Sequence, residues 1–297
     1  PSPPQPSPPA PGPPTPKPPS PYACIVPSGK RPPVKSLPNP IRGYYSWAWE
    51  RHQSDPVDQG PDGSTNWNIG ITFAGAGMTS INGAWVQSMY CPPQTMPKGN
   101  PSNLNFMSIG GGGGDNSWNS PDINAYKSYI PYLKMYQYDG VCFDIETGNA
   151  TPQDFMDIFK LTKEAGLLVM VTISYFAAKW DPQLSKNIND LVINVFTNSA
   201  YVDILSPQLY AGDCNDTWTG QAGGGDWNGI NSDVQTAYKN CNFLAPSINS
   251  NCWNNIVKTW KGLGLPERLG YFQFCQSSMS SGCSTTLSNY FTRTIAR

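Results

Sequence analysis

Eight short apolar runs follow one another along the chain from about residue 40, with polar or helix-like stretches between several of them. We expect strands near residues 43–49, 67–73, 104–109, 139–146, 167–173, 202–209, 243–248 and 269–274. Apolar residues with helical spacing lie between some of these runs, for example over 152–165, 185–197 and 252–262. Near-continuous apolar strands that alternate with helices indicate a parallel sheet buried on both faces.

The number of strands and the length of this region favour a closed barrel. Residues 40–297 match the roughly 250 residues that are typical of a (β/α)8 barrel. The sequence therefore predicts an α/β TIM barrel, and the alternative is a doubly wound open sheet.

The N-terminal segment has a different composition, because 13 of the first 21 residues are proline. Proline lacks the backbone N–H and fixes φ, so polyproline II is the regular conformation that remains for it. We divide the chain into a polyproline II segment (1–22), a linker (23–39) and the barrel (40–297). The alternative for the first segment is a disordered spacer. Its Ser-Pro-Pro repeats resemble hydroxyproline-rich stretches of plant and green-algal wall glycoproteins.

Charge and composition exclude several classes of protein. Charged residues make up 13% of the chain and the net charge is −1, so we expect no nucleic-acid partner and no membrane association. His52 is the single histidine, which excludes multi-histidine metal sites, and we expect neither a metal nor a cofactor. Aromatic residues reach 12%, with 10 tryptophans, which suits the binding of neutral ligands such as glycans.

The cysteines and two glycosylation sequons indicate a secreted, extracellular protein. The 8 cysteines are scattered without a CxxC pair, as in disulfide-bonded secreted chains. The sequons begin at Asn149 and Asn215. Because the chain starts at Pro1 rather than Met, we expect a signal peptide or a longer upstream region to have been removed. Local disulfide candidates are Cys275 with Cys283 and Cys214 with Cys252.

The candidate chemistry lies at the end of the fourth strand, where residues 139–146 read DGVCFDIE. Functional residues of a (β/α)8 barrel lie at the C-terminal ends of the strands. Side chains alternate between faces, so Cys142, Asp144 and Glu146 face the barrel interior and the residues between them face the helices. A charged Asp144 would raise the pKa of Glu146 and keep that residue protonated as a general acid. The alternative is a buried carboxylate pair with backbone and arginine partners and no catalytic role.

Three motifs resemble the family-18 glycoside hydrolases, the chitinase family. The fourth strand of that family carries DGxDxDxE, which residues 139–146 match at all but one position. Its third strand carries SxGG, which residues 108–111 match, and its sixth strand ends in a Met- or Gln-x-Tyr motif, which residues 208–210 match. The motifs occur in the expected order and span most of the barrel.

The resemblance implies substrate-assisted hydrolysis of glycans that contain β-1,4-linked N-acetylglucosamine. The acetamide carbonyl of the sugar would attack its own anomeric carbon, while Glu146 protonates the leaving oxygen and later activates water. Asp144 would bind the acetamide N–H and Tyr210 the acetamide oxygen. The substrate-binding residues that the resemblance suggests are Ser108, Gly110, Gly111, Gln208, Phe274 and Asp213.

The match departs from the family at three positions. Cys142 stands where the family has aspartate, and a buried thiol would stay neutral and could not share a proton with Asp144. An inward-facing Cys142 is also a poor disulfide candidate. Phe274 replaces the tryptophan that floors the sugar site, and Ala211 stands where Asp or Asn is frequent, a role that Asp213 could take over. These departures predict a slow or an inactive enzyme.

Three functions remain open from the sequence. The first is a secreted glycosidase, and the second is a chitinase-like lectin that binds glycans without cutting them. The third is a structural component of an extracellular fibre or cell wall, assembled by self-association or with wall glycoproteins through residues Pro1–Pro21. A glycan on Asn149 would decorate the mouth of the cleft. The tryptophans near strand ends, Trp118 among them, would either stack on sugar rings or pack in the core.

Overall fold

The computed structural model describes the parts of the chain that form the barrel and several of its helices. The described residues are 36–47, 68–73, 104–111, 118–119, 126–128, 130–135, 138–146, 148–174, 188–209, 231–249, 260–265 and 269–274. The predicted polyproline II segment (1–22) lies outside these residues, as does most of the predicted linker.

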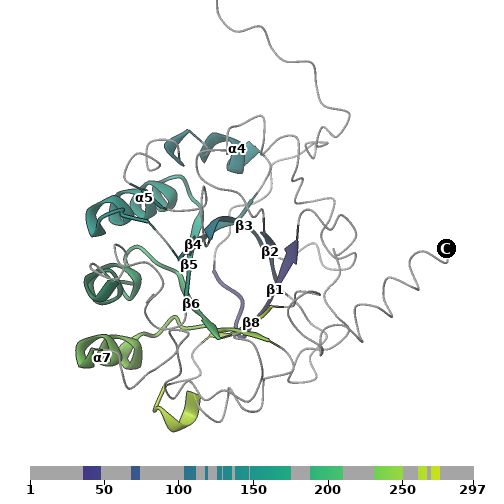
Figure 1. Ribbon diagram of the computed structural model, residues 1–297. Coiled ribbons are helices and arrows are strands. Elements are labelled where there is room, and N and C mark those ends of the chain that lie inside the picture. The colour runs from purple at the N-terminus through teal and green to yellow at the C-terminus, as the bar shows by residue number, and fades with distance from the viewer. Residues whose placement is uncertain are drawn as a thin grey trace, which may run out of the picture.

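Eight parallel strands form a closed barrel in which each strand pairs with its sequence neighbours and β8 pairs with β1 (Figure 1). The strands are β1 (Ile41–Trp47), β2 (Ile69–Phe73), β3 (Leu104–Gly111), β4 (Gly140–Ile145), β5 (Leu168–Ser174), β6 (Ile204–Leu209), β7 (Ser247–Asn249) and β8 (Gly270–Phe274). The prediction of a TIM barrel is therefore confirmed, and the open-sheet alternative is wrong.

The strand limits agree with the apolar runs except at the seventh strand. The run predicted a strand over 243–248, whereas β7 covers Ser247–Asn249 and Leu244 forms an isolated bridge with Leu205. Pro246 lies between the two pieces. Pro246 has no backbone N–H to donate, although its carbonyl accepts from the backbone N–H of Phe272 in β8 at 2.9 Å.

The helices that flank the barrel include α4 (Ile130–Met135), α5 (Pro152–Glu164), the π-helix η2 (Leu191–Phe196) and α7 (Ser232–Asn240). Figure 1 shows α4, α5 and α7 outside the ring of strands. Thr151 and Asp154 form a capping box at the start of α5, and Pro152 occupies its first turn. The helix predicted at 152–165 is thus confirmed. The one predicted at 185–197 is helical from 188 onward, with its main part wound as η2, and of 252–262 only residues 260–262 are described, as helix.

The alternation of side chains along the strands separates two apolar regions. One region lies inside the barrel and takes residues from alternate positions of the strands, among them Ile71, Phe106, Cys142 and Phe272. The other lies between the strands and the helices and contains an aromatic cluster in which Phe143 of β4 packs 4.8 Å from Phe159 of α5. The predicted orientation of β4, with Cys142 inward and Phe143 outward, is therefore confirmed.

The N-terminal rim of the barrel carries one contact three times, which we call the rim clamp. The residue directly before β2, β4 or β6 accepts, through its side-chain oxygen, the backbone N–H of the second residue of the preceding strand. The pairs are Asn68 with Arg42 at 2.9 Å, Asp139 with Asn105 at 2.7 Å and Asp203 with Val169 at 2.8 Å. The same three acceptor residues return a backbone N–H to the carbonyl of the same partner. Each clamp therefore fixes the register of two adjacent strands.

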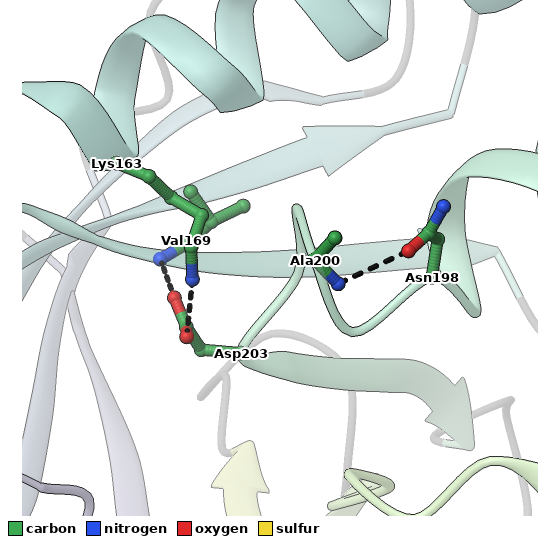
Figure 2. A network of polar contacts seen from close by, with 5 residues as sticks. All are labelled: Lys163, Val169, Asn198, Ala200 and Asp203. Carbon is green, nitrogen blue, oxygen red and sulfur yellow. Dashed lines mark hydrogen bonds and ion pairs between the residues drawn. The ribbon is translucent and has the colours of Figure 1, made fainter.

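The third clamp also holds a helix. Lys163 of α5 places Nζ 2.7 Å from Oδ1 of Asp203, while Oδ2 of that aspartate accepts from Val169 (Figure 2). The turn that leads into this clamp is closed by Asn198, whose side-chain oxygen accepts from the backbone N–H of Ala200 at 3.0 Å. Through its two contacts, Asp203 joins α5 to the start of β5 and β6, on the rim opposite the candidate site.

No helix among the described residues is both long enough and apolar enough to cross a membrane.

Candidate active site

The C-terminal end of β4 places two acidic side chains at different depths. Asp144 faces the barrel interior and is 2% exposed, whereas Glu146 follows the last strand residue and is partly exposed. We call these two residues the carboxyl pair. The period of two along β4 puts both side chains on the inner face, as the sequence predicted. The carboxyl of Asp144 is therefore shielded from solvent, whereas that of Glu146 is accessible to solvent.

Gln208 of β6 bridges the carboxyl pair. Its Nε2 lies 2.9 Å from Oδ1 of Asp144 and 2.9 Å from Oε1 of Glu146, and it donates a hydrogen bond to each. Gln208 is itself 7% exposed. The sequence had offered arginine or backbone partners as the alternative way to hold a buried carboxylate pair. The partner found here is a neutral amide, which cannot cancel the charge of two acids.

Burial raises the pKa of Asp144 well above its ordinary value. The negative charge of Glu146 and a hydrogen bond between the two carboxyl groups raise this pKa further, and the Gln208 amide opposes the rise. The pair therefore holds one proton more readily than two separate acids would. The raised pKa that the sequence assigned to Glu146 stays a prediction.

Beneath the pair, Cys142 has a free thiol that is buried, as the sequence predicted. Burial raises the pKa of this thiol, the charge of Asp144 raises it further, and contacts with the Ser108 and Tyr45 hydroxyls oppose the rise by less. The thiol is therefore neutral at physiological pH. The position that is an aspartate in the family-18 hydrolases carries no charge in this chain.

A chain of hydroxyl groups crosses the barrel at this depth. The Tyr45 hydroxyl lies 2.8 Å from Oγ of Ser247, which lies 2.7 Å from Oγ of Ser206. These residues come from β1, β7 and β6. The interior of the barrel thus changes from apolar at its N-terminal end to polar below the carboxyl pair.

The third strand passes close to β4 at its small residues. Ser108 pairs in register with Cys142, Gly110 with Asp144 and Gly111 with Ile145. Gly110 has φ +99°, and a Cβ atom there would lie 2.3 Å from the backbone oxygen of Asp144. Only glycine fits at this position without displacing the backbone of the candidate site.

Trp118 is a site residue whose role the sequence did not reveal. The sequence left two interpretations open, sugar stacking and core packing, and the side chain is fully buried. Its indole N–H donates a 2.8 Å hydrogen bond to the backbone carbonyl of Asp144. No local sequence signal marks this contact, because it joins two segments 26 residues apart.

Several predicted residues cannot be placed from the described part of the chain. Tyr210, Asp213 and Asn215 lie outside it, and β8 ends at Phe274, whose side chain is not described. Asn149 is described and exposed. The four cysteines of the two predicted disulfides also lie outside the described residues.

The described residues offer no group of three histidine, cysteine or acidic side chains that could hold a metal ion. What the site contains is two carboxyl groups, one buried and one accessible, with a shared amide donor. Such a pair can pass a proton to a bound molecule and take one back. Fold and site together define a (β/α)8 barrel with acid–base groups at the C-terminal end of its fourth strand.

The comparisons with known proteins give distant structural likenesses. No family model matches the chain, and no curated protein matches it in sequence. Among solved structures, the ChiA C-terminal domain of Legionella pneumophila is 14% identical with a TM-score of 0.46, covering 80% of this chain and 93% of that one. A structure reported as chitinase A of Streptomyces coelicolor is 16% identical with a TM-score of 0.36, over 58% and 61% of the two chains.

An enzyme of a different reaction is about as similar. HMG-CoA lyase of Bacillus subtilis is 10% identical with a TM-score of 0.42, covering 80% of this chain and 78% of that one. Barrels of this kind host many unrelated reactions. Likenesses at this distance do not assign a function, which therefore has to be inferred from the site residues.

Proposed function

We propose that this chain is a chitinase-like glycoside hydrolase that cleaves β-1,4-linked N-acetylglucosamine glycans with retention of configuration. The observation that carries the proposal is the carboxyl pair itself. A buried Asp144 and an accessible Glu146 share the amide of Gln208 at 2.9 Å each, at the end of β4. The motifs of residues 108–111, 139–146 and 208–210, which resemble those of family 18, lie on β3, β4 and β6 or directly next to them in the sequence.

In the proposed reaction the substrate supplies the nucleophile. The acetamide oxygen bonds to the anomeric carbon of its own sugar as the glycosidic bond breaks, and the leaving oxygen takes the proton of Glu146. Water then attacks the anomeric carbon of the oxazolinium ion as the bond from that carbon to the acetamide oxygen breaks, which restores the acetamide. The attacking water gives a proton to the Glu146 carboxylate, so the carboxyl pair again holds one proton. Tyr210 would hold the acetamide oxygen.

The raised pKa of Asp144 gives this scheme a physical trigger. In the free protein, burial and the neighbouring charge favour a proton on the Asp144 side of the pair. A bound acetamide N–H would donate to Asp144 and stabilise its charged form, so the shared proton would move to Glu146. The acid would thus be loaded when a sugar with an acetamide group is in place.

Hydrolysis of chito-oligosaccharides tests the proposal. We expect the purified chain to release shorter products, with the new reducing end formed first as the β-anomer in a proton NMR time course. Glu146→Gln should abolish release, whereas Glu164→Gln, at a side chain 61% exposed on α5, should leave it unchanged. Oligomers with glucosamine at the cleaved position should resist cleavage, because they lack the acetamide. A folded protein without turnover contradicts the proposal.

A second candidate function is binding without cleavage, in a lectin or a wall component. The neutral Cys142 thiol favours it, because the pair lacks the third ionisable group of the related hydrolases. Calorimetric binding of chito-oligosaccharide without product formation would support this candidate, and restoration of turnover by Cys142→Asp would identify the cause. We also propose that the chain is secreted, that it is glycosylated at Asn149 and Asn215, and that it assembles through residues 1–21. Deletion of residues 1–21 tests the last of these by its effect on assembly.

A further inference from the structure

The indole of Trp118 is hydrogen-bonded to the main chain just before Glu146. Its Nε1–H donates to the carbonyl of Asp144 at 2.8 Å, two residues before Glu146. This contact is buried, so it is not weakened by competing water. The accepting carbonyl belongs to the next-to-last residue of β4.

The main chain of Trp118 contacts the segment that follows Glu146. It forms a parallel bridge with Gly148, and its carbonyl accepts from the backbone N–H of Ala150 at 3.0 Å. These contacts lie two and four residues after Glu146. One residue therefore binds the chain before and after the proposed catalytic acid.

Two glycines leave the space that these contacts of Trp118 require. A Cβ atom at Gly110 would lie 2.2 Å from Nε1 of Trp118, and one at Gly148 would lie 1.9 Å from its carbonyl oxygen. Both have positive φ, +99° and +128°. Any other residue would therefore meet both a collision and backbone strain. A side chain at position 110 would push the indole away from Asp144, and one at position 148 would push the main chain of Trp118.

The indole itself is fixed by its neighbours. Its ring centroid lies 5.5 Å from that of Phe143, 6.0 Å from that of Phe155 and 6.5 Å from that of Tyr126. Phe143 precedes Asp144 on β4, and Phe155 is in the first turns of α5. The aromatic cluster outside the barrel is thus connected through one N–H to the acidic site inside it.

We propose that Trp118 is a positioning residue that sets the location of the Glu146 carboxyl through its contacts with the backbone of Asp144, Gly148 and Ala150. The assignment rests on the proposed glycosidase for its role in turnover, but the structural connection can be tested without turnover. A shift of even 1 Å in a reacting group is enough to slow an enzyme about 100-fold.

Trp118→Phe tests the proposal, because it keeps an aromatic ring and the main-chain bridge but removes the N–H. We expect kcat on chito-oligosaccharides to fall between about 10-fold and 100-fold with KM within twofold. Tyr126→Phe is the matched control. It removes the buried 2.6 Å hydrogen bond to Thr162 from the same cluster without touching Asp144, and should leave kcat unchanged. Equal losses in the two variants would overturn the proposal.

The carboxyl titration decides the question independently of activity. In protein with 13C-labelled Asp and Glu carboxyls, and with Asp144→Asn used for assignment, Trp118→Phe should lower the apparent pKa of the pair, since a loosened strand end admits water. Tyr126→Phe should leave that pKa in place, and an unchanged titration in Trp118→Phe would overturn the proposal even if the chain proves to have no glycosidase activity. If Trp118→Phe fails to fold, benzothienylalanine at position 118 keeps the shape of the indole without its N–H and gives the same readings.

Discussion

Gln208 and Asp144 meet across the barrel interior although β5 lies between their strands. Nε2 of Gln208 on β6 donates to Oδ1 of Asp144 on β4 at 2.9 Å. Alternate strands of an eight-stranded barrel contribute side chains to the same interior layer. Side chains of β4 and β6 can therefore lie in one layer to which β5 contributes none. This geometry gives a buried acid a hydrogen-bond donor from a segment 64 residues away.

Replacing this donor should change the titration of the pair. Gln208→Met removes a hydrogen bond that favours the charged form, so the pKa of Asp144 should rise further. Loss of a hydrogen bond to a charged group should lower kcat/KM by about 10-fold to 100-fold. Carboxyl NMR and the pH–rate profile measure the two effects. Gln153→Met, which breaks an exposed contact with Asp157 on α5, is the control and should change neither.

The buried carboxyl should make stability depend on pH in a defined direction. The folded-state pKa of Asp144 is raised, so between the unfolded and the folded pKa the native state binds more protons than the unfolded state. The free energy of unfolding should therefore fall as pH rises from about 4 through the folded pKa and then level off. Asp144→Asn removes this contribution and should be the more stable protein at pH 7. Urea unfolding of both proteins at several pH values measures the difference, and a variant as pH-dependent as the parent would contradict it.

A methyl group at Gly110 should be far more costly than one at an open glycine. Gly110→Ala places Cβ against Trp118 and the Asp144 carbonyl, with φ +99°, and should cost about 3 kcal/mol or more in the free energy of unfolding. Gly166→Ala has φ +79° with no atom within 4 Å, so it carries the backbone strain alone and should cost about 1–2 kcal/mol. Thermal or denaturant unfolding compares them. Equal costs would mean that the close approach contributes nothing.

The third rim clamp should owe its strength to the backbone contact rather than to the ion pair. Asp203→Ala leaves the Val169 N–H without its acceptor and should cost about 2–3 kcal/mol. Lys163→Met removes only a partly exposed ion pair and should cost less than about 1 kcal/mol. Lys160→Met, at a more exposed pair on the same helix, should have no measurable effect. Denaturant unfolding ranks the three variants, and the reverse order for Asp203 and Lys163 would contradict this account.

The strands were predictable because each is a short apolar run, and in β3, β4 and β6 every residue is buried, on both faces. The seventh shows the limit of that signal: the apolar run covers residues 243–248, whereas the strand is Ser247–Asn249, preceded by an isolated bridge at Leu244. The inward orientation of Cys142 and Asp144 followed from the period of two along one strand. For η2, the spacing of apolar residues predicted a helix but not its wider π winding.

The contacts that shape the site were not predictable in the same way. The bridging by Gln208 and the hydrogen bond of Trp118 depend on how distant segments meet after the barrel closes. The raised pKa of Asp144 depends on its depth in the barrel, which residue order alone does not specify. The motifs named Asp144, Glu146 and Gln208, which the structure brings together. They did not predict that Asp144 is the buried acid and Glu146 the accessible one.

The three rim clamps lie at the amino ends of the strands, and the carboxyl pair lies at the opposite mouth. The hydrogen bonds that keep adjacent strands in register therefore lie at the opposite end of the barrel from the carboxyl pair. Loops at the end of the barrel that carries the carboxyl pair could be exchanged, by evolution or by an engineer, without loosening the contacts that hold the strands together.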